Sequence, residues 1–151
     1  MNARLTRSEI ESRIPHRGAM CLLESLLECD AGQIRCLATS HTDPAHPLRM
    51  AHGLPAAVAL EIASQAMALH GALNAPAGAP ARAGFLASAR DLRLHAAWLD
   101  NAPGPLVVQA TRLAGDTQQA LYRFALHDAD GRALAEGRAV VILDGQPAAA
   151  R

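Results

Sequence analysis

One stretch of the sequence limits the fold more than any other: residues 54–73 have the sequence LPAAVALEIASQAMALHGAL. Its alanines fall on all sides of a helix rather than on one stripe, which predicts a helix buried on most of its surface. Pro55 suits the first helical turn, and the Asn-Ala-Pro sequence at 74–76 ends the helix, so we expect it over residues 55–73. Because alanine lets neighbouring backbone approach closely, a strongly curved sheet can wrap around such a helix.

Six other segments alternate or have the composition of β-strands: residues 21–29, 32–39, 85–95, 106–113, 119–127 and 132–143. A short helix is expected at 8–13, a hairpin turn at 127–131, and sequential antiparallel order for the later strands. One long helix with about six strands predicts an α+β fold in which a curved antiparallel sheet wraps around a central helix, the geometry of a hotdog fold. We expect a single domain over residues 1–151, with a core at 14–143 and flanking segments at 1–13 and 144–151.

Charge and cysteine content exclude several classes of protein. Lys plus Arg equals Asp plus Glu at 14 each, and no block of like charge stands out, which argues against nucleic-acid binding. The three cysteines include no Cys-x-x-Cys pair, so they indicate neither a disulfide framework nor a zinc site. Glu61, Gln65 and His70 interrupt the apolar stretch, so membrane insertion is not expected. With no signal peptide at the N-terminus, we expect a soluble cytoplasmic protein.

Three stretches resemble the hotdog dehydratases that act on 3-hydroxyacyl-acyl carrier protein. They are IPHRGAMCLL at 14–23, HTDPAHP at 41–47 and LPAAVALEIASQ at 54–65. PLR at 47–49 and GFLASARD at 84–91 are similar to a divergent subfamily of these enzymes, the one associated with aryl polyene biosynthesis. Together the matches touch most of the chain between residues 14 and 143.

The resemblance implies a catalytic pair, with His41 as the base and Glu61 as the acid. A neutral histidine is a suitable base at cellular pH, and a carboxyl group in an apolar pocket has its pKa raised, so Glu61 is expected to be protonated. About five extra residues, 49–53, separate the histidine loop from the helix, so His46 and His52 remain rival candidates for the base. We interpret His16, with Arg17 beside it, as structural.

The same resemblance implies a substrate site around the start of the helix. The amides of Ala56 and Ala57 are expected to face the thioester oxygen, although the family has glycine where Ala56 stands. Gln65, one turn after Glu61, belongs to this site, where such a residue more often satisfies a buried backbone group than it touches substrate. Phe85 and Leu86 are expected to line a tunnel with the helix. The substrate arrives on the phosphopantetheine of acyl carrier protein, so no cofactor or metal is expected. The partners implied are the acyl carrier protein, for which Arg49, Arg82, Arg90 and Arg93 are docking candidates, and a second hotdog subunit in a homodimer or heterodimer.

The leading hypothesis is therefore dehydration of 3-hydroxyacyl thioesters to trans-2-enoyl thioesters during fatty-acid or polyene-type chain elongation. One alternative is an acyl thioesterase of the same fold, which would use a carboxylate and a water molecule at a similar helix. Another is a non-catalytic partner subunit of a heteromeric dehydratase, which would supply half of the interface while another chain provides the catalytic residues. The sequence leaves the acyl chain and the number of assembled dimers open.

Overall fold

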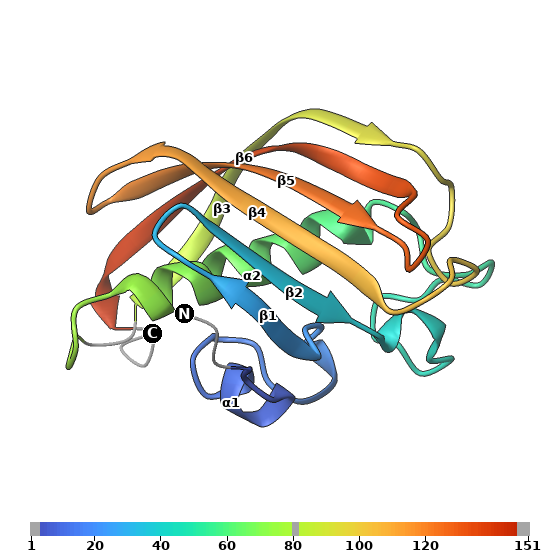
Figure 1. The fold of residues 1–151 in the computed structure, drawn as a ribbon, viewed down its shortest axis with the longest axis horizontal. Coiled ribbons are helices and arrows are strands. Elements are labelled where there is room, and N and C mark those ends of the chain that lie inside the picture. Colours follow the sequence, from blue (N-terminus) through green and yellow to red (C-terminus); the bar gives the residue numbers. More distant parts are fainter. Residues whose placement is uncertain (1–3, 80–81, 148–151) are drawn as a thin grey trace.

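The structure is a computed structural model that describes residues 4–79 and 82–147. A six-stranded antiparallel sheet curves around the long helix α2, and a short helix α1 lies near the N-terminus (Figure 1). In chain order the elements are α1 (Arg7–Glu11), β1 (Ser25–Cys29), β2 (Gln33–Ala38), α2 (Val58–Asn74), β3 (Arg82–Leu94), β4 (Leu106–Gly115), β5 (Gln119–His127) and β6 (Ala133–Pro147). Two single 3₁₀ turns occur at Gly18–Met20 and Ser40–Thr42. The predicted α+β hotdog architecture is confirmed.

The strand order in the sheet is β1-β2-β4-β5-β6-β3. Strands β4, β5 and β6 follow one another as expected, but β3 lies at the edge beside β6, so the prediction of sequential order is wrong for β3. Alternation identifies a strand but carries no information about its partner across a long connection, here residues 95–105. The predicted hairpin between β5 and β6 is confirmed, with Gly131 at φ +83° and the Asp128 carboxylate accepting from the Asp130 and Arg132 amides.

Helix α2 is buried on most sides, as its alanines indicate. Ala59, Ala63 and Ala66 are each 0% exposed, and the helix packs against β2, β4, β5 and β6. The regular helix begins at Val58 rather than at Pro55, because the three preceding residues form a tighter turn with bonds from Val58 N–H to the Pro55 carbonyl and from Ala59 N–H to the Ala56 carbonyl (3.0 Å each). No helix in the described part of the chain is long and apolar enough to cross a membrane.

The boundaries of two strands, β1 and β6, differ from those predicted. β1 begins four residues late, because residues 21–23 lead into it as buried but irregular backbone. β6 extends to Pro147, beyond the expected end of the core at 143.

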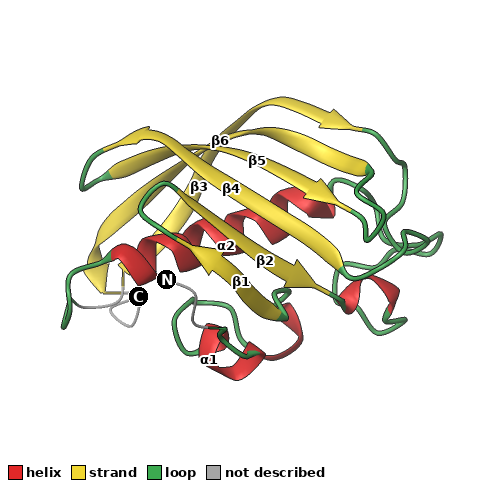
Figure 2. Ribbon diagram, in the orientation of Figure 1, coloured by secondary structure: helices red, strands yellow, loops and turns green. Residues whose placement is uncertain are grey.

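The two faces of the sheet differ in what covers them. Alternate side chains on β4 and β5 face α2 and are buried, among them Val108, Tyr122 and Phe124. Their neighbours in sequence face the opposite way, and no described helix covers that outer face (Figure 2).

Candidate active site

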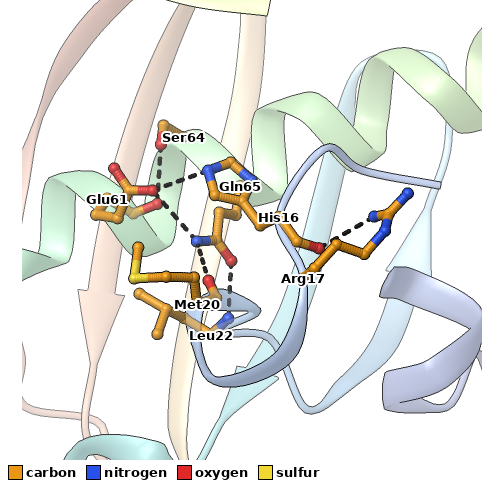
Figure 3. Close-up of polar contacts among 7 residues, drawn as sticks. All are labelled: His16, Arg17, Met20, Leu22, Glu61, Ser64 and Gln65. Carbon is orange, nitrogen blue, oxygen red and sulfur yellow. Dashed lines mark hydrogen bonds and ion pairs between the residues drawn. The ribbon is translucent and has the colours of Figure 1, made fainter. Parts of the chain in front are cut away.

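The Glu61 side chain lies in the first turn of α2 and is 34% exposed. Its Oε1 atom accepts a hydrogen bond from His16 Nε2 at 3.0 Å and another from Gln65 Nε2 at 3.2 Å. Figure 3 shows the three side chains converging, with His16 reaching the helix from the N-terminal segment. The structure therefore pairs Glu61 with a histidine that is 45 residues away in the sequence.

Gln65 fastens this N-terminal segment to the helix. Its side chain is 0% exposed, its Oε1 accepts from the Leu22 N–H at 2.8 Å, and its Nε2 donates to the Met20 carbonyl at 2.8 Å. The amide oxygen therefore accepts from the backbone, and the amide nitrogen donates both to the backbone and to Glu61. These contacts agree with the interpretation of Gln65 as a partner of buried backbone groups beside the site, because a buried amide is fully used where backbone groups need partners.

The residues around His16 hold it in place from the other side. The Arg17 guanidinium donates to the carbonyls of Glu11 and Ile14 and points away from Glu61 (Figure 3). Gly18 adopts φ +58°, a conformation that favours glycine, and its N–H donates to the Glu11 carboxylate at 2.9 Å. Arg17 is structural as predicted, and the Pro-His-Arg-Gly sequence presents the His16 ring to α2.

The protonation state of Glu61 differs from the expectation. The hydrogen bond from His16 lowers the pKa of the Glu61 carboxyl below its usual value, and the bond from Gln65 adds to this, whereas burial acts in the opposite direction. The prediction that burial would dominate, keeping Glu61 protonated, is therefore wrong: the carboxyl is ionised at neutral pH. Its second oxygen, Oε2, has no hydrogen-bond partner among the described residues.

At the start of the helix only one of the two expected amides is free. The Ala56 N–H donates to the Ala97 carbonyl at 3.0 Å, which corrects the expectation that it faces a substrate. The Ala57 N–H, on an exposed residue, has no acceptor within the described ranges 4–79 and 82–147. A free amide at a helix start is suited to an oxygen that gains negative charge.

His41 makes different contacts. It is 3% exposed, and its Nε2 donates to the Ala102 carbonyl at 3.1 Å. A Cβ placed on Gly104 would lie 2.5 Å from His41 Cε1, so the ring fills the space that a side chain at 104 would need. None of the contacts of His41 or Glu61 joins the two residues within one chain.

The rival histidines have partners of their own. His46 Nδ1 accepts from the Leu48 N–H at 3.0 Å, and burial lowers the pKa of His46. His52 packs edge-on against Trp98, with ring centroids 6.4 Å apart. Neither of them contacts Glu61.

Phe85 and Leu86 lie on the edge strand β3 and are 45% and 41% exposed. Phe85 is opposite Ile142, whereas Leu86 is opposite the buried Val141, so the two side chains project from opposite faces of the strand. Within one chain, only Leu86 is on the face that α2 covers.

A metal is not accommodated by the described side chains, because no group of three or more His, Cys, Asp or Glu residues comes together among them. The three cysteine side chains are buried, and burial raises the pKa values of their thiols, that of Cys36 to about 12.

The contact between His16 and Glu61 was not predicted from the sequence, where His16 was interpreted as structural. The sequence did mark His16 as a residue of interest, because it lies in the stretch at residues 14–23 that resembles the dehydratase family. A pairing across 45 residues depends on how the segment folds back onto α2, and spacing alone does not give it.

A curved sheet around a buried helix, with a half-buried carboxylate in the first helical turn, defines a hotdog-fold protein. The family model described as ApeP-like, ApeP dehydratase, matches residues 8–150, and the chain belongs to this dehydratase family. No curated protein matches the sequence.

Solved structures share the fold at low sequence identity. The dehydratase heterocomplex ApeI:P from Xenorhabdus doucetiae is 21% identical, with 91% of each chain covered and a TM-score of 0.76. A thioesterase from Haemophilus influenzae is 13% identical, covering 95% of this chain and 93% of that one, with a TM-score of 0.66. A mutant thioesterase from Pseudomonas aeruginosa is 10% identical, with 80% of each chain covered and a TM-score of 0.61. These likenesses establish the hotdog fold, whereas membership of the dehydratase family comes from the family model.

Proposed function

We propose that this chain dehydrates 3-hydroxyacyl thioesters carried on acyl carrier protein to trans-2-enoyl thioesters, in polyene-type or fatty-acid chain elongation in the cytoplasm. The dehydratase family supports the reaction class. The observation that carries the proposal is the hydrogen bond from His16 Nε2 to Glu61 Oε1, which leaves an ionised carboxylate with a free oxygen in the first turn of α2. A carboxylate that is ionised before the substrate binds can accept a proton from carbon, and its lowered pKa favours passing that proton on to the leaving hydroxyl.

The chemistry follows from this arrangement. Glu61 Oε2 takes the proton from the carbon next to the thioester carbonyl, and that electron pair forms the carbon–carbon double bond as the bond to the β-hydroxyl breaks. The proton on Glu61 then passes to the departing hydroxyl, which leaves as water and restores the carboxylate. The Ala57 N–H stabilises the negative charge that develops on the thioester oxygen, because the donor is already oriented before the charge appears.

His16 is a positioning residue in this proposal. Its N–H keeps Glu61 ionised and fixes the carboxylate orientation, while Gln65 fixes the segment that carries His16. His41 retains a role as base only if a second subunit brings its loop to a Glu61 of this chain, as the family resemblance implies.

The proposed assembly is a dimer through the edge strand β3, either with a second copy or with another hotdog subunit. This strand leaves Phe85, Leu86, Leu92 and Leu94 exposed at 39–46%, and an open edge with apolar side chains is a surface on which another strand can pair. The related structure described as a dehydratase heterocomplex favours a heteromeric partner.

The test is to incubate the protein with 3-hydroxyacyl carrier protein, alone and with a co-encoded hotdog subunit, and to follow the loss of water by mass spectrometry. We expect dehydration that Glu61→Gln lowers by about 10²- to 10⁴-fold, the usual contribution of a general acid–base group. Ser64→Ala, one helical turn away, serves as the matched control, because the Ser64 hydroxyl binds only the Glu61 backbone carbonyl.

Three results would overturn the proposal in different ways. Release of free acid indicates a thioesterase. Activity that needs the partner subunit and is unaffected by Glu61→Gln indicates a non-catalytic subunit. Absence of dehydration under both conditions rejects the reaction itself.

A further inference from the structure

The outer face of the sheet carries three arginines side by side on neighbouring strands. Arg90 on β3 lies opposite Arg138 on β6, and Arg138 lies opposite Arg123 on β5. All three are exposed, and none forms an ion pair with a side chain that the structure describes. We call these three residues the arginine row.

The arginine row is expected to destabilise the sheet on which it lies. Like charges directly opposite one another on neighbouring strands are destabilising. The chain as a whole has no net charge, so this cluster is not a by-product of a basic composition. A second copy of the same face would place arginine against arginine, which excludes self-association through this face.

The arginine row borders an open hollow of about 660 Å³. A bulge in β3 between Arg90 and Arg93, with Asp91 at φ +53°, bends this strand beside the hollow. Its charged lining consists of three arginines, Arg93, Arg123 and Arg138, and two carboxylates, Asp91 and Glu136. Glu136 lies 3.5 Å from His95. The hollow therefore has one more cation than anion along its lining and is open to a large partner.

We propose that the arginine row is the docking surface for an acidic helix of a partner protein. Neighbouring strands are about 4.8 Å apart, so the row presents a cation at each step across a width of about 10 Å. A helix lying across the strands presents a carboxylate at every turn, about 5.4 Å apart, when Glu or Asp recurs on one face. The two spacings match. The chain contains no lysine, and the forked guanidinium groups of its arginines bind carboxylates through two parallel bonds.

The arginine row does not take part in the catalytic chemistry proposed above. It rests on the proposed function in one respect only, since that function names the carrier protein as a source of the acidic helix. Nucleic acid is disfavoured as the occupant because the Tyr122 and Phe124 rings on β5 are buried against α2 and are not available for base stacking.

The experiment measures binding of the full chain to a labelled alanine-based helix of about 24 residues with Glu at every fourth position, a length that is helical in water. Fluorescence anisotropy at low salt is compared for the wild type, the Arg123→Ala/Arg138→Ala double variant and the Arg35→Ala control. Arg35 also lies on the outer face but is paired with Glu28 at 3.4 Å. We expect the double variant to bind roughly tenfold more weakly, the control to be unchanged, and wild-type binding to weaken as salt is added.

Equal binding by the wild type and the double variant, or no binding by the wild type at low salt, overturns the proposal. Loss of peptide binding when millimolar inorganic phosphate is added at constant ionic strength would instead assign the row to a small anion. In a second arm, holo-acyl carrier protein replaces the peptide. If the peptide binds through the row and the carrier protein does not, the docking surface stands with another acidic partner, and only its link to the proposed function fails.

Discussion

His16 and His41 both lie in segments that resemble dehydratase motifs, yet they have different surroundings. His16 is 27% exposed by its side chain and donates to a carboxylate, whereas His41 is 3% exposed and donates to a backbone carbonyl. A carboxylate changes charge with pH and can exchange a proton, and a carbonyl cannot. The chemistry of each histidine is therefore determined by the group that accepts its N–H, and not by its place in a sequence motif.

The largest expected effect is on the hydrogen bonds by which Gln65 holds the segment at residues 16–22 against α2. Gln65→Leu leaves the Leu22 N–H and the Met20 carbonyl without partners in a buried site, which costs about 1–3 kcal/mol for each group. We expect a clear loss in the free energy of unfolding, together with faster hydrogen exchange at residues 16–22. Gln65→Glu keeps the acceptor for Leu22 but places a second carboxylate beside the ionised Glu61, so we expect this variant to be destabilised as well. A Gln65→Leu protein as stable as the wild type would show that the segment is held in another way.

The next effect concerns the packing of His41. Gly104→Ala places a methyl group against the His41 ring, and we expect it to destabilise the protein by about 1–3 kcal/mol. In a His41→Ala background the same substitution has space, so the two changes should be strongly non-additive in a double-mutant cycle. Additive effects in chemical denaturation would contradict a packing role for His41.

A smaller effect is expected on the catalytic rate when the His16 side chain is removed. His16→Ala removes a hydrogen bond to a charged group, and we expect kcat to fall by about tenfold with little change in KM. His16→Gln keeps a neutral donor and should recover part of the loss. Steady-state dehydration rates provide the measurement, and a wild-type kcat in His16→Ala would contradict the positioning role.

The smallest effect is on stability in acid. Because the folded-state pKa of Glu61 lies below its unfolded value, the carboxylate stabilises the fold above the unfolded pKa, and this contribution is lost as pH falls through the folded pKa. His16→Ala should therefore reduce the difference in the free energy of unfolding between neutral and acid pH. Denaturation midpoints of the wild type and His16→Ala across the acid range test this, and an equal loss of stability toward acid pH in both proteins would contradict it.

The sequence predicted the layers of the fold but not the contacts that make the site. The alanines of α2 indicated a helix enclosed by a sheet, and alternation located most strands, because burial on one face leaves a period in the sequence. The partner of β3 was not predictable, since pairing across residues 95–105 is decided by tertiary packing. The ionised state of Glu61 was missed for the same reason, because it depends on His16, which the fold brings from 45 residues away.

The most direct test of the central claim is a ¹³C NMR titration of the Glu61 carboxyl group in the wild type, His16→Ala and His41→Ala. The account predicts a pKa below the ordinary range in the wild type, a higher pKa when His16 is removed, and no change when His41 is removed. A pKa that rises in His41→Ala and stays low in His16→Ala would contradict the account, and would return the base to the histidine loop at residues 41–47.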